Sequence, residues 1–347
     1  MGMRRLDGAD GFVVTDLDDL GMHAGVARCA PKVLADSAWL LARCATYQYA
    51  AAERAVGGAS VGINAAPDAR ATTIPAVVAA LGDLAAAGLA LDAGRGLSDA
   101  DLAPLHAADG RPDGFAAGRE RLVAEGVAAA IEAVRPLDGA TVALESLDSQ
   151  SAALAVAVTQ RGARVVAIAS GADAVTNPGG VDPDALAGVA DSPTAAAGGA
   201  AGDGGLGTLG TTAARDDVLT AEVDVLAVGS KLGAIDHTVA TGVQASVIAP
   251  SNWVPVTTRA LAVLTRAEVL VLPDFVALAG AIPASGLGAD VADDPLAAAS
   301  TLVGALIAES AAGVGEAWPN LVLAACARAE AFLTGGGHEL PQSRPLG

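Results

Sequence analysis

The sequence predicts an α/β protein of two domains, the second built on a doubly wound parallel sheet. At 347 residues the chain exceeds what one ordinary hydrophobic core holds. Hydrophobic residues make up 52% and aromatic residues only 3%, so Ala, Val and Leu must fill the cores. From Leu137 onward, strand-like runs alternate with helical ones, which is typical of βαβ units. We therefore expect an α/β domain over 1–118 and a Rossmann-like domain over 119–290. C-terminal helices over 291–334 and a disordered tail over 335–347 follow.

The N-terminal domain begins with residues 11–28, which predict a strand, an acidic turn and an extended segment. Apolar and polar residues then alternate at helical spacing from Asp36 to Tyr49, with Asp36 or Ser37 as the expected cap. The further elements expected are a strand at 61–63, a helix over 74–90 with Pro75 in its first turn, a loop with a short helix over 92–114, and a helix over 120–134.

The second domain opens with a strand over 138–144, a helix over 149–162 and a strand over 163–170, which form one βαβ unit. Residues 191–212 are rich in Ala and Gly and predict a flexible loop or insertion. Later strands are expected at 223–228, 245–249 and 269–272. The chain after Asp294 reads as helical to about Leu333, followed by the disordered tail.

Composition excludes several classes of function. A net charge of −19 disfavours nucleic acid as a partner, because binding to phosphates needs a basic surface. The three cysteines show no metal-binding spacing and are expected to be buried thiols, so we expect no metal and a reducing, cytoplasmic setting. No secretory signal and no apolar run of about 18 residues is apparent, which predicts no membrane partner.

The segment Thr46–Gly62, TYQYAAAERAVGGASVG, reads as a helix running into a glycine-rich turn. Gly57 and Gly58 would let the backbone approach a ligand or adopt a positive φ, and a tight helix-to-strand connection is the alternative. The segment resembles T-Y-K-N-A-A-A-G-L-x-x-G-G-G-K, the substrate-site motif of the glutamate/leucine/phenylalanine/valine dehydrogenases. Further similar segments follow in the family's order: NPGGVD at 177–182, VDVLAVGSKLGA at 223–234 and LPDFVALAGAI at 272–282.

This resemblance covers about residues 13–282 and is closest to the leucine/valine branch of the family. It implies an N-terminal oligomerisation domain, a Rossmann-like domain and a cleft between them. In the family, one lysine binds the substrate carboxylate and a second polarises a catalytic water, assisted by an aspartate base. These three positions fall on Gln48, Ser60 and Gly94. The resemblance therefore predicts that no catalytic residue of the ancestral reaction remains.

Two charged residues near these positions are candidates for substitutes. Asp92 lies two residues from the aspartate position and is either a displaced base or a carboxylate of a surface turn. The chain has only two lysines, Lys32 and Lys231. Lys231 falls in the loop that approaches the nicotinamide in the family, although a solvated loop lysine is the simpler interpretation.

The cofactor turn of the family, G-x-G-x-x-G/A, falls on residues 146–151. Its glycine positions all carry residues with side chains: Ser146, Asp148 and Ser151. Asp148 would place a negative charge where a pyrophosphate binds at a helix N-terminus, and Glu145 would add a second. The acid that holds the ribose falls on Ser170, with Asp173 as a displaced substitute. We therefore expect no bound cofactor, although the family uses NAD(P).

Two further motifs of the family depart from its pattern at the expected cleft. The asparagine of P-D-x-x-x-N-A-G-G falls on Leu278, and the A-x-x-A-N segment reads Ala249-Pro250-Ser251-Asn252-Trp253. Trp253 lies at or beside the asparagine position. Phe275, Leu278 and Trp253 are expected to form an apolar patch there.

The leading hypothesis is a homologue that has lost NAD(P)-dependent oxidative deamination and acts as a pseudoenzyme, a structural or regulatory subunit. It would form a homo-oligomer, or a hetero-oligomer with a homologous dehydrogenase. Three alternatives stay open: a divergent enzyme that recruits Lys231, Asp92, Asp148 or His237 in the same cleft, a module that binds amino or keto acids, and a weak NAD(P)-dependent amino-acid dehydrogenase. The sequence names neither the ligand of the cleft nor the partner.

Overall fold

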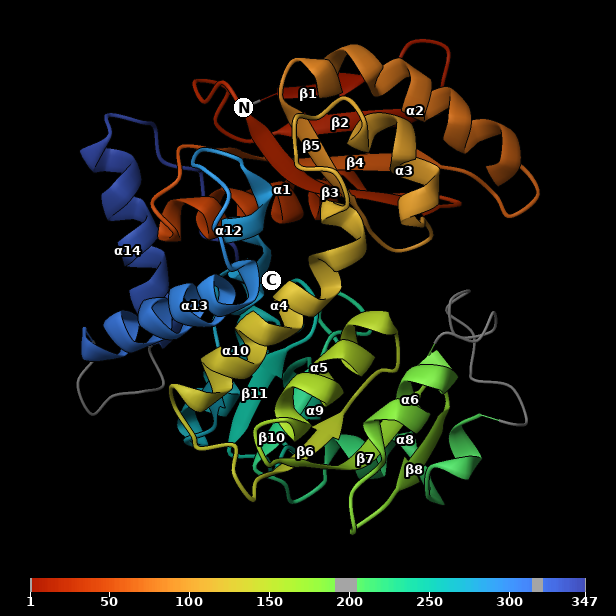
Figure 1. Ribbon diagram of the computed structural model, residues 1–347, viewed down its shortest axis with the longest axis vertical. Coiled ribbons are helices and arrows are strands. Elements are labelled where there is room, and N and C mark those ends of the chain that lie inside the picture. Colours follow the sequence, from red (N-terminus) through yellow and green to blue (C-terminus); the bar gives the residue numbers. More distant parts are fainter. Residues whose placement is uncertain (1, 191–204, 314–320, 347) are drawn as a thin grey trace. The chain divides into compact units, whose positions relative to one another are not determined.

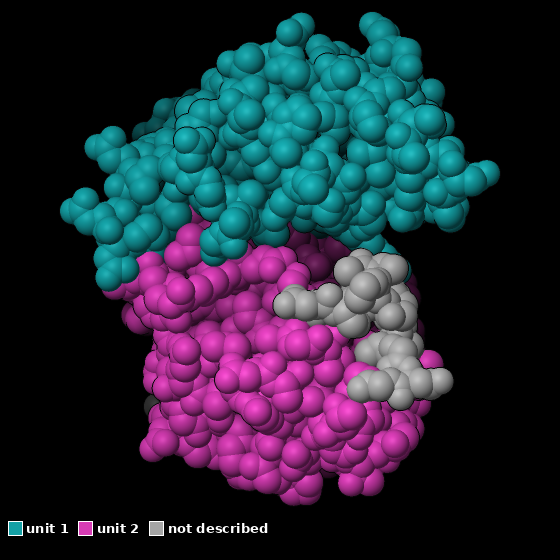
Figure 2. Space-filling model, turned by 45° about the vertical axis from the view of Figure 1, so that its right-hand side comes forward, with its two compact units in different colours: residues 1–119, 282–295, 326–345 teal, residues 120–281, 296–325, 346–347 magenta. Residues whose placement is uncertain are grey.

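The computed structural model describes residues 2–190, 205–313 and 321–346. The chain divides into two compact units, which Figure 2 shows in different colours. Unit 1 comprises Met1–Arg119, Ile282–Pro295 and Cys326–Pro345. Unit 2 comprises Glu120–Ala281, Leu296–Ala325 and Leu346–Gly347. The first passage between units falls after Arg119, and the C-terminal helices are shared between the two units.

Unit 1 contains a five-stranded sheet in the order β1-β2-β4-β3-β5 (Figure 1). Its strands are β1 Gly2–Arg5, β2 Gly11–Thr15, β3 His23–Ala30, β4 Gly57–Asn64 and β5 Leu89–Ala93. The β1–β2 and β2–β4 pairs are antiparallel, whereas β3 pairs in parallel with both β4 and β5. The helices are α1 Ala35–Ala51, α2 Arg70–Ala86, α3 Asp99–His106, α12 Ile282–Ser285 and α14 Leu321–Gly335, whose first turn belongs to unit 2.

The two faces of this sheet have separate hydrophobic cores. Strand residues alternate between faces, so Val61 and Ile63 pack against α2 while their neighbours face α1. On the α1 side, Phe12 and Val14 pack against Ala38 and Ala42. Helix α1, which carries the first part of the predicted substrate segment, is thus fixed directly on the sheet.

The predicted glycine turn at Gly57 and Gly58 is wrong, because both residues belong to β4. Neither is among the left-handed residues of the described chain. A Cβ added to Gly58 would lie 1.6 Å from the carbonyl oxygen of Ala42. The glycine is therefore needed for close approach between the backbones of α1 and β4, which is the alternative interpretation of this dipeptide.

Helix starts also differ from the expected positions. Helix α1 begins after Leu34 without a side-chain cap, and the Ser37 hydroxyl donates to the Leu34 carbonyl oxygen at 2.8 Å. Neither Asp36 nor Ser37 is therefore the cap. Helix α2 begins at Arg70, so Pro75 lies inside the helix instead of at its start. Helical spacing identified both helices, but local hydrogen bonding fixed their first residues.

Unit 2 contains a seven-stranded sheet in the order β12-β11-β10-β6-β7-β8-β9. Its strands are β6 Thr141–Leu144, β7 Arg164–Ser170, β8 Asp173–Thr176, β9 Thr211–Ala214, β10 Val225–Val228, β11 Val247–Pro250 and β12 Leu270–Val271. The first five strands in this order are parallel, and β8 and β9 extend the sheet by antiparallel pairing. The predicted parallel β6–α5–β7 unit is confirmed. Because β7 and β10 lie on opposite sides of β6, the order reverses between β6 and β10.

The helices of unit 2 lie before, between and after these strands in the chain. They are α4 Phe115–Glu132, whose first residues belong to unit 1, α5 Ser149–Thr159, α6 Pro183–Ala190, η1 Leu206–Thr208, α8 Arg215–Leu219, α9 His237–Ala240, α10 Thr258–Arg266, α11 Asp274–Ala277, η2 Leu278–Ala281 and α13 Pro295–Ala312. Most of the predicted loop, residues 191–204, lies outside the described residues. Residues 205–212 form η1 and begin β9, because pairing with β8 orders them as an edge strand.

Helix α13 is long and apolar enough to cross a membrane by length and composition, but it contains Glu309 and is not the uncharged run whose absence the sequence predicts. A core helix of a soluble protein passes the same test, so this is weak evidence for a membrane. Val303, Leu306 and Ile307 on this helix are buried.

The tail after Gly335 is held by side-chain contacts, so the predicted disorder of this segment is wrong for residues up to 346. Arg344 pairs with Glu330 through two hydrogen bonds of 2.7 and 2.8 Å. Glu330 also accepts from the Tyr47 hydroxyl at 2.9 Å, and Arg43 donates to Ser343 at 2.6 Å. These contacts attach the C-terminal segment to α1 within unit 1.

Candidate functional site

The residues at the two lysine positions lie on adjacent elements of unit 1. Gln48 belongs to α1 and is 8% exposed, and Ser60 belongs to β4 and is fully buried. Ser60 pairs with Val14 and therefore shares the sheet face that α1 covers. Within the described chain the Ser60 hydroxyl has no hydrogen-bond partner. A neutral, buried hydroxyl among apolar neighbours cannot replace a cationic lysine.

A polar cluster beside these residues was not identified from the sequence. The Thr46 hydroxyl donates to the carboxylate of Asp16 at 3.0 Å and accepts from the backbone N–H of Gly58 at 2.9 Å. The Arg43 guanidinium lies 3.8 Å from Asp16. Burial raises the pKa of the Asp16 carboxyl above its usual value, against the opposing effects of Thr46 and Arg43. The cluster joins β2, α1 and β4, and the long separation of Asp16 from Thr46 in sequence hides it.

The aspartate position of the family falls on Gly94, directly after β5. A Cβ at Gly94 would lie 2.4 Å from Cγ2 of Val26 and 2.8 Å from the carbonyl oxygen of Ala27. A side chain does not fit there without movement of β3. This site therefore holds no general base at Gly94.

Asp92 takes part in a partly buried ion-pair network. Its carboxylate accepts from Arg111 at 2.6 Å, and Arg119 lies 3.8 Å away. Arg111 also pairs with Asp109 at 2.7 Å and stacks over the ring of Phe115 at 4.8 Å. Because two arginines hold the carboxylate of Asp92, we interpret it as structural.

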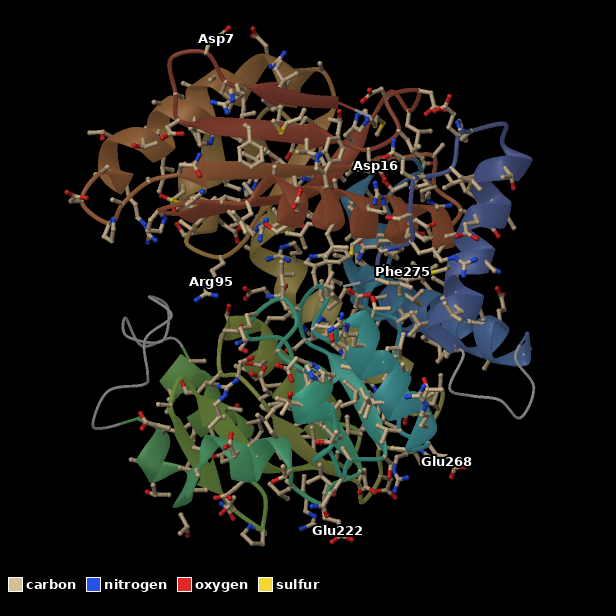
Figure 3. The ribbon with its side chains drawn as sticks, turned by 180° about the vertical axis from the view of Figure 1, so that it is seen from behind. Asp7, Asp16, Arg95, Glu222, Glu268 and Phe275 are labelled. Atoms are coloured by element: carbon tan, nitrogen blue, oxygen red, sulfur yellow. The ribbon has the colours of Figure 1, made fainter. Side chains whose placement is uncertain are left out.

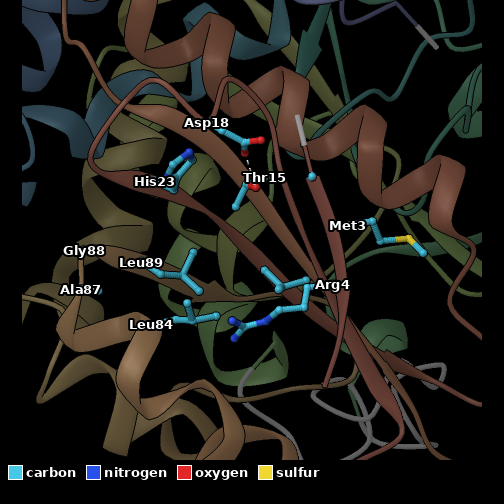
Figure 4. Close-up of a pocket in the computed structure, with 11 residues that line it drawn as sticks. Met3, Arg4, Thr15, Asp18, His23, Leu84, Ala87, Gly88 and Leu89 are labelled. Carbon is cyan, nitrogen blue, oxygen red and sulfur yellow. Dashed lines mark hydrogen bonds between the residues drawn. The ribbon is translucent and has the colours of Figure 1, made fainter. Parts of the chain in front are cut away.

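A pocket of about 320 Å³ in unit 1 contains none of the predicted site residues (Figure 4). Thr15, Asp18, His23, Leu84 and Leu89 are among its lining residues. Burial lowers the pKa of the His23 imidazole below its usual value. The histidine is therefore largely neutral near pH 7.

The remaining cleft candidates lie in unit 2. Lys231 is exposed in the loop after β10, as expected for a solvated lysine. Asn252 is exposed and accepts from the backbone N–H of Trp253 at 2.8 Å. Trp253 is half-buried. Phe275 and Leu278 are buried on α11 and η2, and Figure 3 shows the position of Phe275.

At the predicted cofactor turn, Asp148 caps helix α5. Its carboxylate accepts from the backbone N–H of Ser151 at 2.8 Å, and the Ser151 hydroxyl accepts from the backbone N–H of Asp148 at 2.8 Å. This capping box places a carboxylate at the helix N-terminus, where the positive end of the helix would otherwise attract a phosphate.

Glu145, the residue after β6, is fully buried and accepts hydrogen bonds from the loop that follows β10. One carboxylate oxygen accepts from the backbone N–H groups of Gly229 at 3.2 Å and Ser230 at 2.9 Å. The other accepts from the Ser230 hydroxyl at 2.5 Å and pairs with the Arg215 guanidinium. Arg215 also donates to the carbonyl oxygen of Gly171, after β7, at 3.0 Å.

These contacts lie at the carboxyl ends of β6, β7 and β10, where the strand order reverses and where such sheets bind their ligands. A pyrophosphate would meet two carboxylates there, and Glu145 already uses the backbone donors of the β10 loop. These side chains occupy the N-terminus of α5 and the backbone donors of the β10 loop. The sequence predicts a second negative charge at Glu145. The structure pairs this charge with Arg215 and places it on the backbone donors of the β10 loop. Arg215, Gly229 and Ser230 were missed, since nothing in their sequence marks them as partners of Glu145.

Three other predicted positions of the cofactor site differ in exposure. Ser170 is buried at the end of β7, whereas Asp173 is exposed at the start of β8. The hydroxyl of Ser146 is buried without a partner among the described residues. In the same part of the chain no cluster of three His, Cys, Asp or Glu residues could hold a metal.

The chain is similar in sequence to known dehydrogenases. The model of the Glutamate/Leucine/Phenylalanine/Valine dehydrogenase family matches residues 120–294. The NADP-specific glutamate dehydrogenase A1 of Halobacterium salinarum is 32% identical over 151 residues, which are 44% of this chain and 34% of that protein. The aligned region thus spans about a third of that curated relative.

Solved structures share the fold over most of the chain. The hetero-hexameric glutamate dehydrogenase from Thermus thermophilus in its Leu-bound form superposes with a TM-score of 0.74 at 24% identity, over 92% of this chain and 84% of that one. The glutamate dehydrogenase of Plasmodium falciparum gives a TM-score of 0.76 at 11% identity, over 94% of this chain and 79% of that one. At these identities the likeness establishes the fold alone.

Proposed function

This chain belongs to the glutamate/leucine/phenylalanine/valine dehydrogenase family, and we propose that it is a member that has lost NAD(P)-dependent oxidative deamination. The observation that carries the proposal is the carboxylate of Glu145, buried on backbone donors at the strand-order reversal, where such sheets bind their ligands. The capping carboxylate of Asp148 adds to it.

The substrate side supports the same conclusion independently. The two lysine positions hold neutral Gln48 and buried Ser60, and the aspartate position holds Gly94 without room for a side chain. Losing one positioned acid–base group costs on the order of 10²–10⁴ in rate, and groups that act as a unit need not add their losses. Even one such loss, combined with an obstructed cofactor site, takes turnover below detection.

The test is amino-acid-dependent reduction of NAD⁺ or NADP⁺ by the purified protein. We expect no reduction above a heat-inactivated control with leucine, valine, phenylalanine or glutamate. A proven dehydrogenase of the family, assayed in parallel, shows that the assay detects turnover. Amino-acid-dependent formation of NADH or NADPH by the unmodified chain would contradict the proposal.

Nucleotide binding is tested separately by titration calorimetry. Neither NAD⁺ nor NADP⁺ should bind measurably at concentrations of about 1 mM, because the Asp148 carboxylate would repel the pyrophosphate and Glu145 occupies backbone donors at the same edge of the sheet. The Asp148→Gly variant should bind the nucleotide more tightly, because it lacks the carboxylate at the helix N-terminus. The variant should lose little stability, since glycine costs only a few tenths of a kcal/mol as a helix cap. A dissociation constant of about 10 μM or below for the unmodified chain would reverse this claim.

We further propose that the chain acts as a structural or regulatory subunit, either in a homo-oligomer or with a homologous active dehydrogenase. The structurally similar glutamate dehydrogenase of Thermus thermophilus is hetero-hexameric, which is a precedent for such mixed assembly. Native mass spectrometry of the chain alone, and coexpressed with a dehydrogenase of the family from the same source, tests it. A monomer in both samples would contradict this role.

A weak NADP-dependent glutamate dehydrogenase is the second candidate, favoured by the 32% identity to the Halobacterium salinarum protein. The glutamate and NADP⁺ arm of the turnover assay decides between the two. If only glutamate with NADP⁺ gives turnover, the protein is a weak NADP-dependent glutamate dehydrogenase.

A further inference from the structure

The groups around the Glu145 carboxylate are all hydrogen-bond donors, and they come from separate parts of unit 2. Arg215 is the first residue of α8, and Gly229 and Ser230 follow β10. Together they supply a guanidinium, two consecutive backbone N–H groups and a hydroxyl to one carboxylate. Glu145 itself is fully buried.

Such a donor set is complementary to any small oxyanion, not only to a glutamate side chain. Consecutive backbone N–H groups form an anion-binding concavity, and a guanidinium suits carboxylate and phosphate geometry. The donors are held independently of Glu145: Arg215 donates to the Gly171 carbonyl oxygen at 3.0 Å, and the backbone N–H of Ser251 donates to Val228 at 2.8 Å, at the end of β10. The loop and the guanidinium therefore have supports that remain when Glu145 is shortened.

We propose that Glu145 is an internal ligand of an oxyanion site formed by Arg215, Gly229 and Ser230, and that this site binds a small carboxylate or phosphate once the side chain is removed. The tether to β6 gives the glutamate a high effective concentration, which excludes free anions from the unmodified protein. The inference is independent of the proposed loss of activity, because it concerns occupancy of the donors and not turnover.

The Glu145→Ala variant tests this by chemical rescue. It lacks the CH₂–COO⁻ group that acetate supplies. Breaking the pair leaves the partly buried Arg215 without its carboxylate, so the melting temperature should fall by roughly 5 °C or more. About 100 mM acetate should restore at least roughly half of that loss, compared with chloride at matched ionic strength and pH. Inorganic phosphate forms a second arm, and a response to phosphate alone would support the site while assigning it to phosphate.

Three proteins serve as matched controls: the unmodified chain, Glu145→Gln and the double variant Glu145→Ala/Arg215→Ala. Glutamine keeps the site filled, and the double variant lacks the cation, so none of the three should respond to acetate or phosphate. Equal stabilisation of all four proteins would reveal a general salt effect and overturn the proposal. A folded Glu145→Ala protein that responds to neither anion would also overturn it.

Where Glu145→Ala is isolated unfolded, the measurement becomes the refolding yield from denaturant with acetate or chloride. The Glu145→Gly variant is the second test, with propionate as the matching anion because it replaces the whole missing side chain. The anion should raise the yield of each variant at least about twofold, a ratio that corresponds to ~0.4 kcal/mol at RT ≈ 0.59 kcal/mol. Equal yields with the organic anions, phosphate and chloride in both variants would refute the proposal.

Discussion

The carboxylates of this chain have different roles because their hydrogen-bond partners and burial differ. Asp148 caps a helix, Asp92 is held by two arginines, and Glu145 is fully hydrogen-bonded inside unit 2. Asp274 differs, because its surroundings favour the neutral form. It is 9% exposed and accepts from the backbone N–H of Val254 at 2.6 Å, yet burial raises its pKa to about 6.

This raised pKa predicts a pH-dependent stability. The folded protein holds the Asp274 proton up to a pH of about 6, whereas the unfolded chain releases it near pH 3.8. The stabilising contribution is therefore fully present below about pH 4 and is lost as the pH rises through about 6. The uncharged Asp274→Asn variant lacks this dependence.

The measurement is denaturant unfolding of both proteins at pH 4 and pH 7. Between pH 4 and pH 7, the unfolding free energy of the unmodified protein should fall relative to that of Asp274→Asn. The relative fall should be at most about 3 kcal/mol. The paired comparison cancels the titration of the other carboxyl groups. A difference between the proteins that stays constant from pH 4 to pH 7 would contradict the raised pKa.

At the scale of elements, glycines set how closely helices and strands approach. Gly58 lies where β4 meets the backbone of α1, and its added Cβ would lie 1.6 Å from the Ala42 carbonyl oxygen. Gly82, inside α2, has no neighbouring atom within 4 Å of an added Cβ. The same substitution at these positions therefore has opposite consequences.

We expect Gly58→Ala to lower the unfolding free energy of unit 1 by at least ~2 kcal/mol, because backbone atoms must move apart. Gly82→Ala should raise it by about 0.5–1 kcal/mol through helix propensity. Urea denaturation followed by circular dichroism measures both. Equal effects of the two substitutions would show that close packing of α1 on β4 does not govern this position.

Regular elements were predictable from sequence where their pattern is local. The β6–α5–β7 unit and the span of α1 follow from periodicity within a few residues. Contacts between distant residues were not predictable: Arg215 meets Glu145 70 positions away, and Arg344 meets Glu330 across a segment whose composition suggested disorder. Of the candidate site, the neutral residues at Gln48 and Ser60 could be read directly, but their burial could not.

At the scale of the whole molecule, the positions that align with the family's substrate site are closely packed against their neighbours. Ser60 lies beneath α1, and Gly94 lies against Val26 and Ala27. We therefore expect that restoring the family's residues by Gln48→Lys, Ser60→Lys and Gly94→Asp introduces two side chains, at positions 60 and 94, for which there is no space.

We expect this triple variant to show no amino-acid-dependent NADH or NADPH formation and to melt below the unmodified protein. Burying an unpaired charge at Ser60 alone costs several kcal/mol. Turnover assays and thermal denaturation measure the two effects, with Ser60→Ala as the control that leaves stability nearly unchanged. Detectable turnover by the triple variant, with residues 146–151 left as they are, would disprove this account.

The pairing of Glu145 with Arg215 also restricts how this lineage can evolve. Under the proposed function, a descendant that regains nucleotide binding must lose the glutamate, but losing it first leaves the arginine without its counter-charge. Losing the arginine first leaves a fully buried glutamate without its only cationic partner among the described contacts. Either single substitution gives a less stable intermediate, so selection for folding alone favours keeping the pair. Under the proposed function, the pair is therefore a barrier to regaining nucleotide binding, because each single substitution that opens the site first weakens the fold.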